Sequence, residues 1–122
     1  GMESERLRVH PGDFFMDALP SADCYLIMQV IHDWEDAKAA RILAAIRKAA
    51  APGAKLLLIE CIVPEDSNPS WTKMLDLQML ALLSGKERTE KEYSEMLRTA
   101  GFRLDRAIDV GMSTSILESV AV

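Results

Sequence analysis

The sequence predicts an α/β protein built on an open, mostly parallel sheet that ends in an antiparallel edge. Two short and nearly continuous apolar runs, at residues 24–28 and 56–59, are typical of parallel strands that are covered on both faces. A helical pattern separates these runs, and two strands of mixed polarity, at 102–108 and 113–120, follow near the C-terminus. The strand–helix–strand order is that of a βαβ unit, whose crossover should be right-handed.

The first part of the chain predicts three strands and one helix. A short strand over residues 6–10 should end at Pro11-Gly12, and strands over 23–31 and 55–63 should contain the two apolar runs. Between them, Asp33 is a candidate N-cap, with Asp36 three residues on as a weak capping box. The helix should bury one face and stop at a Pro-Gly pair; that face consists of Ala39, Ile42, Leu43 and Ile46.

The second part predicts two more helices and a pair of strands. The polar segment at 64–69 should be a loop, followed by a helix over residues 70–83 with Gly85 beyond its end. A third helix should begin at Thr89, where Thr89 and Glu92 form a capping box, and should end at Gly101 in the left-handed conformation. Its buried face should consist of Tyr93, Met96, Leu97 and Ala100. The last two strands should turn at Gly111 and pair antiparallel at the sheet edge.

Length and composition limit the classes of function. The 122 residues are enough for one modest core, so residues 1–122 should form a single domain. A formal net charge of −5 argues against nucleic-acid binding by phosphate neutralisation. No apolar stretch approaches the roughly 20 residues that span a bilayer. The first six residues contain no apolar region, so no secretory signal is expected. Cys24 and Cys61 lie in apolar runs and should be buried, reduced thiols of a cytoplasmic protein.

The chemistry is expected at one edge of the sheet. In open α/β sheets, ligands bind beyond the carboxyl ends of the parallel strands. Gly12-Asp13-Phe14-Phe15 follows the first predicted strand, His32-Asp33-Trp34 follows the second, and Glu60 lies near the end of the third. If the second and third strands are neighbours about 4.8 Å apart, His32 and Glu60 should meet.

A histidine–carboxylate pair of this kind has a known chemical use. A neutral imidazole accepts a proton from a hydroxyl, and a carboxylate at its other nitrogen fixes the tautomer and stabilises the imidazolium. The plain alternative is a structural histidine at the start of a helix. Glu60 stands in an apolar strand and therefore needs a partner or an exposed position. The sequence has no zinc-ligand spacing, nucleophile elbow or phosphate-binding loop, so no metal site is expected.

An ordered set of motifs resembles one enzyme family. The motifs run through nearly the whole chain, in this order: Gly12-Asp13-Phe14-Phe15, Leu19-Pro20-x-Ala22-Asp23, His32-Asp33-Trp34, Glu60, Asp76-Leu77-x-Met79, Gly85-Lys86-Glu87-Arg88-Thr89 and Ala100-Gly101-Phe102. Together they resemble the S-adenosylmethionine-dependent small-molecule O-methyltransferases, which include plant caffeate-type and acetylserotonin enzymes. Each motif is weak alone, and the order carries the resemblance. The resemblance implies a partial Rossmann-like methyltransferase fold.

The resemblance also implies roles for individual residues. His32 looks like the family's general base, and Glu60 and Glu87 look like the acidic residues that flank it. Asp13 and Phe14 look like residues that hold the adenine end of S-adenosylmethionine, while Trp34 and Met79 match positions near the acceptor pocket. The implied reaction is direct methyl transfer, without a metal, to a hydroxyl of a small, aromatic molecule.

The resemblance starts near the third strand of the family's sheet, so the family's dimerisation domain and glycine-rich cofactor loop are expected to be missing. No Gly-x-Gly occurs in the chain. The strand over residues 23–31 should then have an apolar, unpaired edge, which predicts a homo-oligomer with little or no activity of its own. Two alternatives stay open. One is a non-catalytic remnant that serves as an oligomerising or interaction module, and the other is an unrelated flavodoxin-like module.

Overall fold

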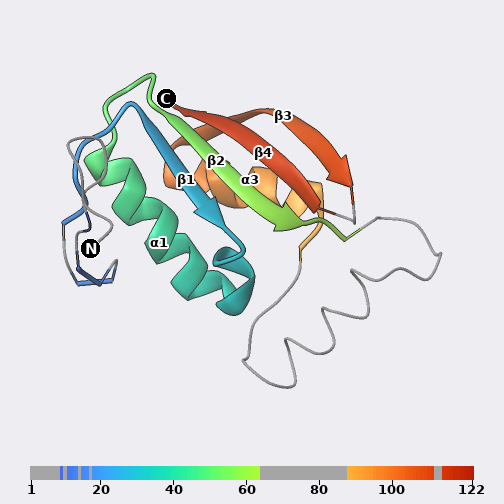
Figure 1. Ribbon diagram of the computed structural model, residues 1–122, viewed down its shortest axis with the longest axis horizontal. Coiled ribbons are helices and arrows are strands. Elements are labelled where there is room, and N and C mark those ends of the chain that lie inside the picture. Colours follow the sequence, from blue (N-terminus) through green and yellow to red (C-terminus); the bar gives the residue numbers. More distant parts are fainter. Residues whose placement is uncertain (1–8, 10, 14, 17, 64–87, 112–113) are drawn as a thin grey trace.

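The computed structural model describes residues 9, 11–13, 15–16, 18–63, 88–111 and 114–122. Their elements, shown in Figure 1, are the strands β1 (Cys24–Met28), β2 (Lys55–Cys61), β3 (Phe102–Gly111) and β4 (Thr114–Ala121), the 3-10 helix η1 (Ile31–Asp33), and the α-helices α1 (Asp36–Ala49) and α3 (Glu90–Ala100). The predicted strand over 6–10, apart from Val9, and the predicted helix over 70–83 lie outside the described residues.

The four strands form one mixed sheet in the order β1-β2-β4-β3. The pair β1–β2 is parallel, with Met28 opposite Ile59, so the predicted adjacency of these two strands is confirmed. Strand β4 is antiparallel to both β2 and β3, which confirms the antiparallel C-terminal edge. Within the described residues, one of the three neighbouring strand pairs is therefore parallel.

Helix α1 buries the predicted face but begins later than predicted. Its four inward residues are at most 2% exposed: Ala39, Ile42, Leu43 and Ile46. Asp33 does not cap it, because Asp33 belongs to η1 and the N-cap is Glu35, which makes no side-chain capping bond. The extended backbone of Trp34 (φ −121°, ψ 145°) separates the two helices. The residue His32 consequently lies on a short turn of its own, ahead of α1.

Helix α3 follows its local sequence closely. The hydroxyl of Thr89 accepts the Glu92 N–H at 3.1 Å, and the Glu92 carboxylate accepts the Thr89 N–H at 3.1 Å, so the capping box is confirmed. Gly101 ends the helix with φ +99°, as predicted. Tyr93 and Leu97 are fully buried, and Met96 and Ala100 pack against the core as partly buried residues.

The core lies on one face of the sheet. Leu56 and Leu58 of β2 and Leu117 of β4 are fully buried in the same cluster as the inner faces of α1 and α3. On β1, alternate residues point the other way, and Leu26 and Met28 are 61% and 59% exposed. Cover on both faces of β1 is therefore wrong for the described residues.

The two cysteines differ in burial. Cys24 shares the outward phase of Leu26 and is exposed, so its predicted burial is wrong. Cys61 is buried as predicted, and both thiols are free. Among the described residues, no helix combines the length and apolarity that crossing a bilayer requires.

Candidate functional site

The turn that carries His32 begins with an unusual residue at the end of β1. Gln29 has φ +52°, a left-handed conformation that costs a non-glycine residue about 1–2 kcal/mol. Its N–H still donates to the Ile59 carbonyl at 2.8 Å, so the chain leaves β1 while tied to β2. The two backbone bonds of η1 follow, from Asp33 N–H to Val30 O and from Trp34 N–H to Ile31 O.

Glu60 lies beneath this turn and is fully buried. It faces the helix side of the sheet, in phase with Leu56 and Leu58. Its Oε1 accepts the Ile31 N–H at 3.0 Å, and its Oε2 lies 3.0 Å from Nδ1 of His32. The second contact has the separation of an ion pair without the alignment of a hydrogen bond. The two residues that the sequence predicted to meet are thus brought together.

The other nitrogen of His32 also lies near a carboxylate. Nε2 is 3.1 Å from Oδ1 of Asp33, whose side chain is 41% exposed, whereas the side chain of His32 is 9% exposed. Each ring nitrogen of His32 therefore has a carboxylate oxygen within 3.1 Å. Asp33 has access to water and Glu60 has none, so Glu60 is the fixed partner and Asp33 the movable one. The motif resemblance implies no role at the site for Asp33.

Asp13 lies in a turn that packs, through Phe15, against Trp34 at the end of η1. Oδ1 of Asp13 accepts the Phe15 N–H at 2.8 Å, and its carbonyl accepts the Met16 N–H at 3.0 Å, which makes a tight turn. The Phe15 ring meets the Trp34 ring edge to face, with centroids 5.0 Å apart. This packing joins the turn at Asp13 to the turn that carries His32.

The groups at this turn fit a nucleoside. A carboxylate accepts hydrogen bonds from ribose hydroxyls, and aromatic rings offer an apolar surface to an adenine. The guanidinium of Arg41 already lies 5.1 Å from the centroid of the Phe15 ring, and Nζ of Lys38 lies 5.6 Å from that of Trp34. Phe14, Met79 and Glu87, the other predicted site residues, lie outside the described residues.

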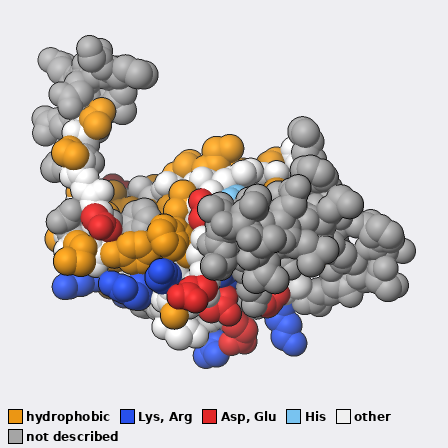
Figure 2. Space-filling model, turned by 90° about the horizontal axis from the view of Figure 1, so that it is seen from below, with side chains coloured by type: hydrophobic (Ala, Val, Ile, Leu, Met, Phe, Trp, Pro, Cys, Tyr) orange, Lys and Arg blue, Asp and Glu red, His pale blue; other side chains and the backbone are white. Residues whose placement is uncertain are grey.

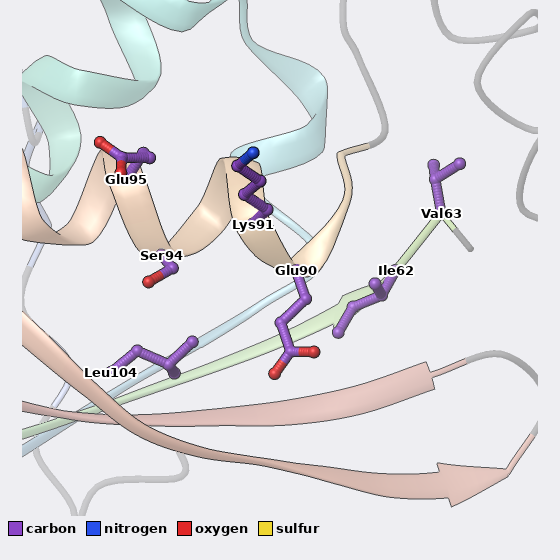
Figure 3. A pocket seen from close by; sticks show the side chains of 7 residues that line it. All are labelled: Ile62, Val63, Glu90, Lys91, Ser94, Glu95 and Leu104. Carbon is purple, nitrogen blue, oxygen red and sulfur yellow. The ribbon is translucent and has the colours of Figure 1, made fainter. Parts of the chain in front are cut away.

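A cavity of about 530 Å³ lies elsewhere, between the start of α3 and the sheet (Figure 3). Its lining includes Ile62 and Val63 after β2, Glu90 and Ser94 of α3, and Leu104 of β3. None of the groups around His32 lines it.

The charges on the surface are mixed. Figure 2 shows lysine and arginine side chains interspersed with aspartate and glutamate on the face seen from below. Within the described residues, no group of three or more histidine, cysteine, aspartate or glutamate side chains has the arrangement of a metal site.

Comparison with known proteins identifies the family. A family model described as an O-methyltransferase domain matches residues 1–103. Acetylserotonin O-methyltransferase of Gallus gallus is 47% identical over 102 residues, which cover 83% of this chain and 30% of the relative.

Solved structures of methyltransferases are also similar to this chain. Human N-acetylserotonin methyltransferase in complex with SAM has a TM-score of 0.86 at 36% identity, covering 92% of this chain and 33% of that one. The O-methyltransferase NcsB1 from neocarzinostatin biosynthesis, in complex with SAM and 2-hydroxy-5-methyl naphthoic acid, has a TM-score of 0.79 at 34% identity. The match covers 91% of this chain and 32% of NcsB1. The chain thus spans about a third of the length of these relatives. With a family match over most of its length and a sheet that superposes on these enzymes, the chain belongs to the O-methyltransferase domain family.

Proposed function

We propose that the protein containing this sequence transfers the methyl group of S-adenosylmethionine to a hydroxyl of a small, aromatic molecule, with His32 as general base. The observation that carries the proposal is the 3.0 Å approach of Nδ1 of His32 to the fully buried carboxylate of Glu60. The bound naphthoic acid of NcsB1 supports an aromatic acceptor.

The residues act through the two nitrogens of His32. Glu60 holds the proton on Nδ1, which leaves the lone pair on Nε2 for the acceptor hydroxyl. Asp33 moves aside when the hydroxyl takes its place, since its side chain reaches water. Nε2 then removes the hydroxyl proton, and Glu60 stabilises the imidazolium that results. S-adenosylmethionine supplies an electrophilic methyl group when it is bound.

The remaining assignments complete this proposal. Asp13 and Phe14 hold the nucleoside end of the cofactor, Trp34 and Met79 border the acceptor, and Glu87 is a second acidic partner of His32. These roles rest on the motif resemblance. The position of Asp13 beside an aromatic pair, and of Trp34 next to η1, is compatible with them. Both cysteines are free, which suits a reducing compartment, and we infer a cytoplasmic protein.

The test measures transfer of labelled methyl from S-adenosylmethionine to a panel of phenols. It uses the longest protein that contains this chain, with His32→Ala as the variant. The variant should lose about 10²–10⁴-fold in kcat, because that is the usual contribution of a general base. Calorimetric binding of the cofactor should be unchanged. Undiminished transfer by the His32→Ala protein would overturn the assignment of the base.

A second candidate is an association module without activity. It is favoured by the exposed apolar side chains of Leu26 and Met28 on β1, a strand that has one neighbour among the described strands. For the isolated 122-residue chain we propose self-association and little or no methyl transfer. Calorimetry with S-adenosylmethionine on the longest protein that contains this chain distinguishes the two candidates, because only the enzyme needs to bind the cofactor.

A further inference from the structure

Arg88 is the largest of the fully buried side chains in the described part of the molecule. Arginine is almost never fully buried unless its charge is paired, because removing a guanidinium from water is costly. Its position, between the predicted acidic residue Glu87 and the helix cap Thr89, gives no local reason for burial. The reason has to come from what the guanidinium binds.

The guanidinium of Arg88 binds on both sides of His32. Its Nη1 donates to the carbonyl of Ile31 at 3.2 Å, and its Nη2 donates to the carbonyl of Trp34 at 2.8 Å. Its Nε and Nη2 also donate to Oδ1 of Asp36, at 3.0 and 2.9 Å. One planar group therefore holds the start of η1, its end, and the first residue of α1.

The backbone of Arg88 is fixed to the strand that carries Glu60. Ile62, two residues after Glu60, forms a parallel bridge with Arg88, and the Val63 N–H donates to the Arg88 carbonyl at 2.9 Å. Arg88 is therefore anchored to the extension of β2 at one end and to the His32 turn at the other.

We propose that Arg88 is a positioning residue for His32; this inference rests on the proposed methyl transfer. Glu60 fixes the Ile31 N–H, and Arg88 fixes the Ile31 and Trp34 carbonyls, so the turn is held through donors and acceptors at once. Lysine cannot replace Arg88, because one ammonium lacks the rigid fork that reaches these separated acceptors. The function of Arg88 is to keep Nδ1 facing Glu60 and Nε2 facing the acceptor.

The chain provides a matched control for a purely structural role. Arg47 also donates to three backbone carbonyls, those of Gly101, Ala50 and Val122, at 2.8–3.1 Å. These contacts join the ends of α1, α3 and β4, and none of them involves η1. Arg47→Lys therefore removes a comparable fork without touching the His32 turn.

The experiment determines the tautomer of His32 from imidazole ¹⁵N shifts in the 122-residue chain, at a pH where the ring is neutral. There are two histidines, so His10→Gln assigns the signals. The wild-type chain and Arg47→Lys should carry the proton on Nδ1, and Arg88→Lys should give a mixture of tautomers. A wild-type tautomer in Arg88→Lys, with a melting temperature lowered as in Arg47→Lys, would overturn the proposal. Should Arg88→Lys not fold, Asp36→Asn loosens the same fork and is expected to give the mixture, whereas an unmixed Nδ1 tautomer would reject it.

Turnover separates this inference from the proposed function. In the longest protein that contains the chain, Arg88→Lys should lower kcat by up to about 10²-fold, the scale of a misplacement of about 1 Å, and leave KM for the cofactor unchanged. If the wild-type protein transfers no methyl group, the proposed function fails, while the tautomer result still decides the role of Arg88.

Discussion

Glu60 explains why a polar cluster forms inside an apolar sheet. A buried carboxylate is tolerated when polar groups of the protein replace water. Both oxygens of Glu60 have such a group in the His32 turn: the Ile31 N–H lies 3.0 Å from Oε1, and Nδ1 of His32 lies 3.0 Å from Oε2. The same contacts order the imidazole. One buried carboxylate thus contacts both the backbone of the turn and the imidazole that we propose as the base.

Glu118 gives a test of electrostatics away from the site. Hydrogen bonds from Arg106 and then from Lys55 lower the pKa of this carboxyl from 4.5. Because the pKa is lower in the folded than in the unfolded chain, the stabilisation is present above pH 4.5 and is lost as the pH falls through the folded value. Wild type should be more stable than Glu118→Gln at pH 7, and the difference should vanish in acid.

The measurement is urea unfolding of both chains from pH 7 down to about pH 2. Since exposed ion pairs are screened by salt, 1 M NaCl should reduce the pH 7 difference. A difference that stays constant over the pH range would show that Glu118 stabilises the sheet by packing and not by charge.

At the scale of the element, the cap of α3 is expected to contribute to stability. Thr89→Ala removes the acceptor of the Glu92 N–H and should cost about 1 kcal/mol. Thr99→Ala in the same helix is the control, because the hydroxyl of Thr99 bonds only the Glu95 carbonyl, on the exposed side. Equal unfolding free energies for the two variants would argue against the capping box.

Two of the three described glycines with positive φ allow backbone strain to be separated from steric crowding. Gly101 has φ +99°, and a Cβ there would lie 3.1 Å from the Arg47 side chain, whereas Gly53 has φ +91° with open space around it. The free energy of unfolding should fall by about 1–2 kcal/mol in each alanine variant, because alanine is strained in the left-handed conformation. The fall should be larger in Gly101→Ala, where the new Cβ also crowds Arg47. Thermal unfolding of the pair checks this; a larger loss at Gly53 would contradict the role of Arg47.

Local signals predicted the elements well where they are self-contained. The capping box at Thr89, the glycine at 101 and the apolar spacing of α1 are short-range features, and the structure agrees with each. The predicted role of Asp33 as the N-cap of α1 is wrong because Asp33 belongs to η1. Glu60 and Arg88 hold η1 by hydrogen bonds, and both are distant from it in sequence. Arg88 was missed because nothing near it in sequence indicates what it binds. The meeting of His32 and Glu60 was predictable, since adjacent parallel strands end at one edge.

For the whole molecule, β1 is the surface through which we propose that the chain associates. It has β2 as its neighbour in the described sheet, and it presents Leu26 and Met28 to solvent. An apolar strand edge of this kind pairs readily with another chain. The exposure of Cys24 on the same face was not predictable, because an apolar run does not reveal which face the helices leave uncovered.

Sedimentation velocity on the 122-residue chain tests this association. The wild-type chain should sediment as an oligomer, and Leu26→Lys should shift it toward the monomer by placing a charge on the exposed face. Ile108→Lys, on β3 at the opposite edge, is the control and should leave the oligomer intact. A wild-type chain that is monomeric at all concentrations would rule the association out.

We propose that Glu60 orients His32 for proton removal, and a double-mutant cycle on methyl transfer measures whether the two side chains act as one unit. Glu60→Gln preserves an acceptor for the Ile31 N–H but offers Nδ1 an amide N–H, which moves the imidazole proton to Nε2 and removes the base. The cycle, measured in the longest protein that contains the chain, should give a loss in kcat of about 10²–10⁴-fold for Glu60→Gln or His32→Ala alone. The double variant should lose little more than either, because both remove one function. Full turnover in Glu60→Gln, or losses that multiply in the double variant, would rule out this role of Glu60.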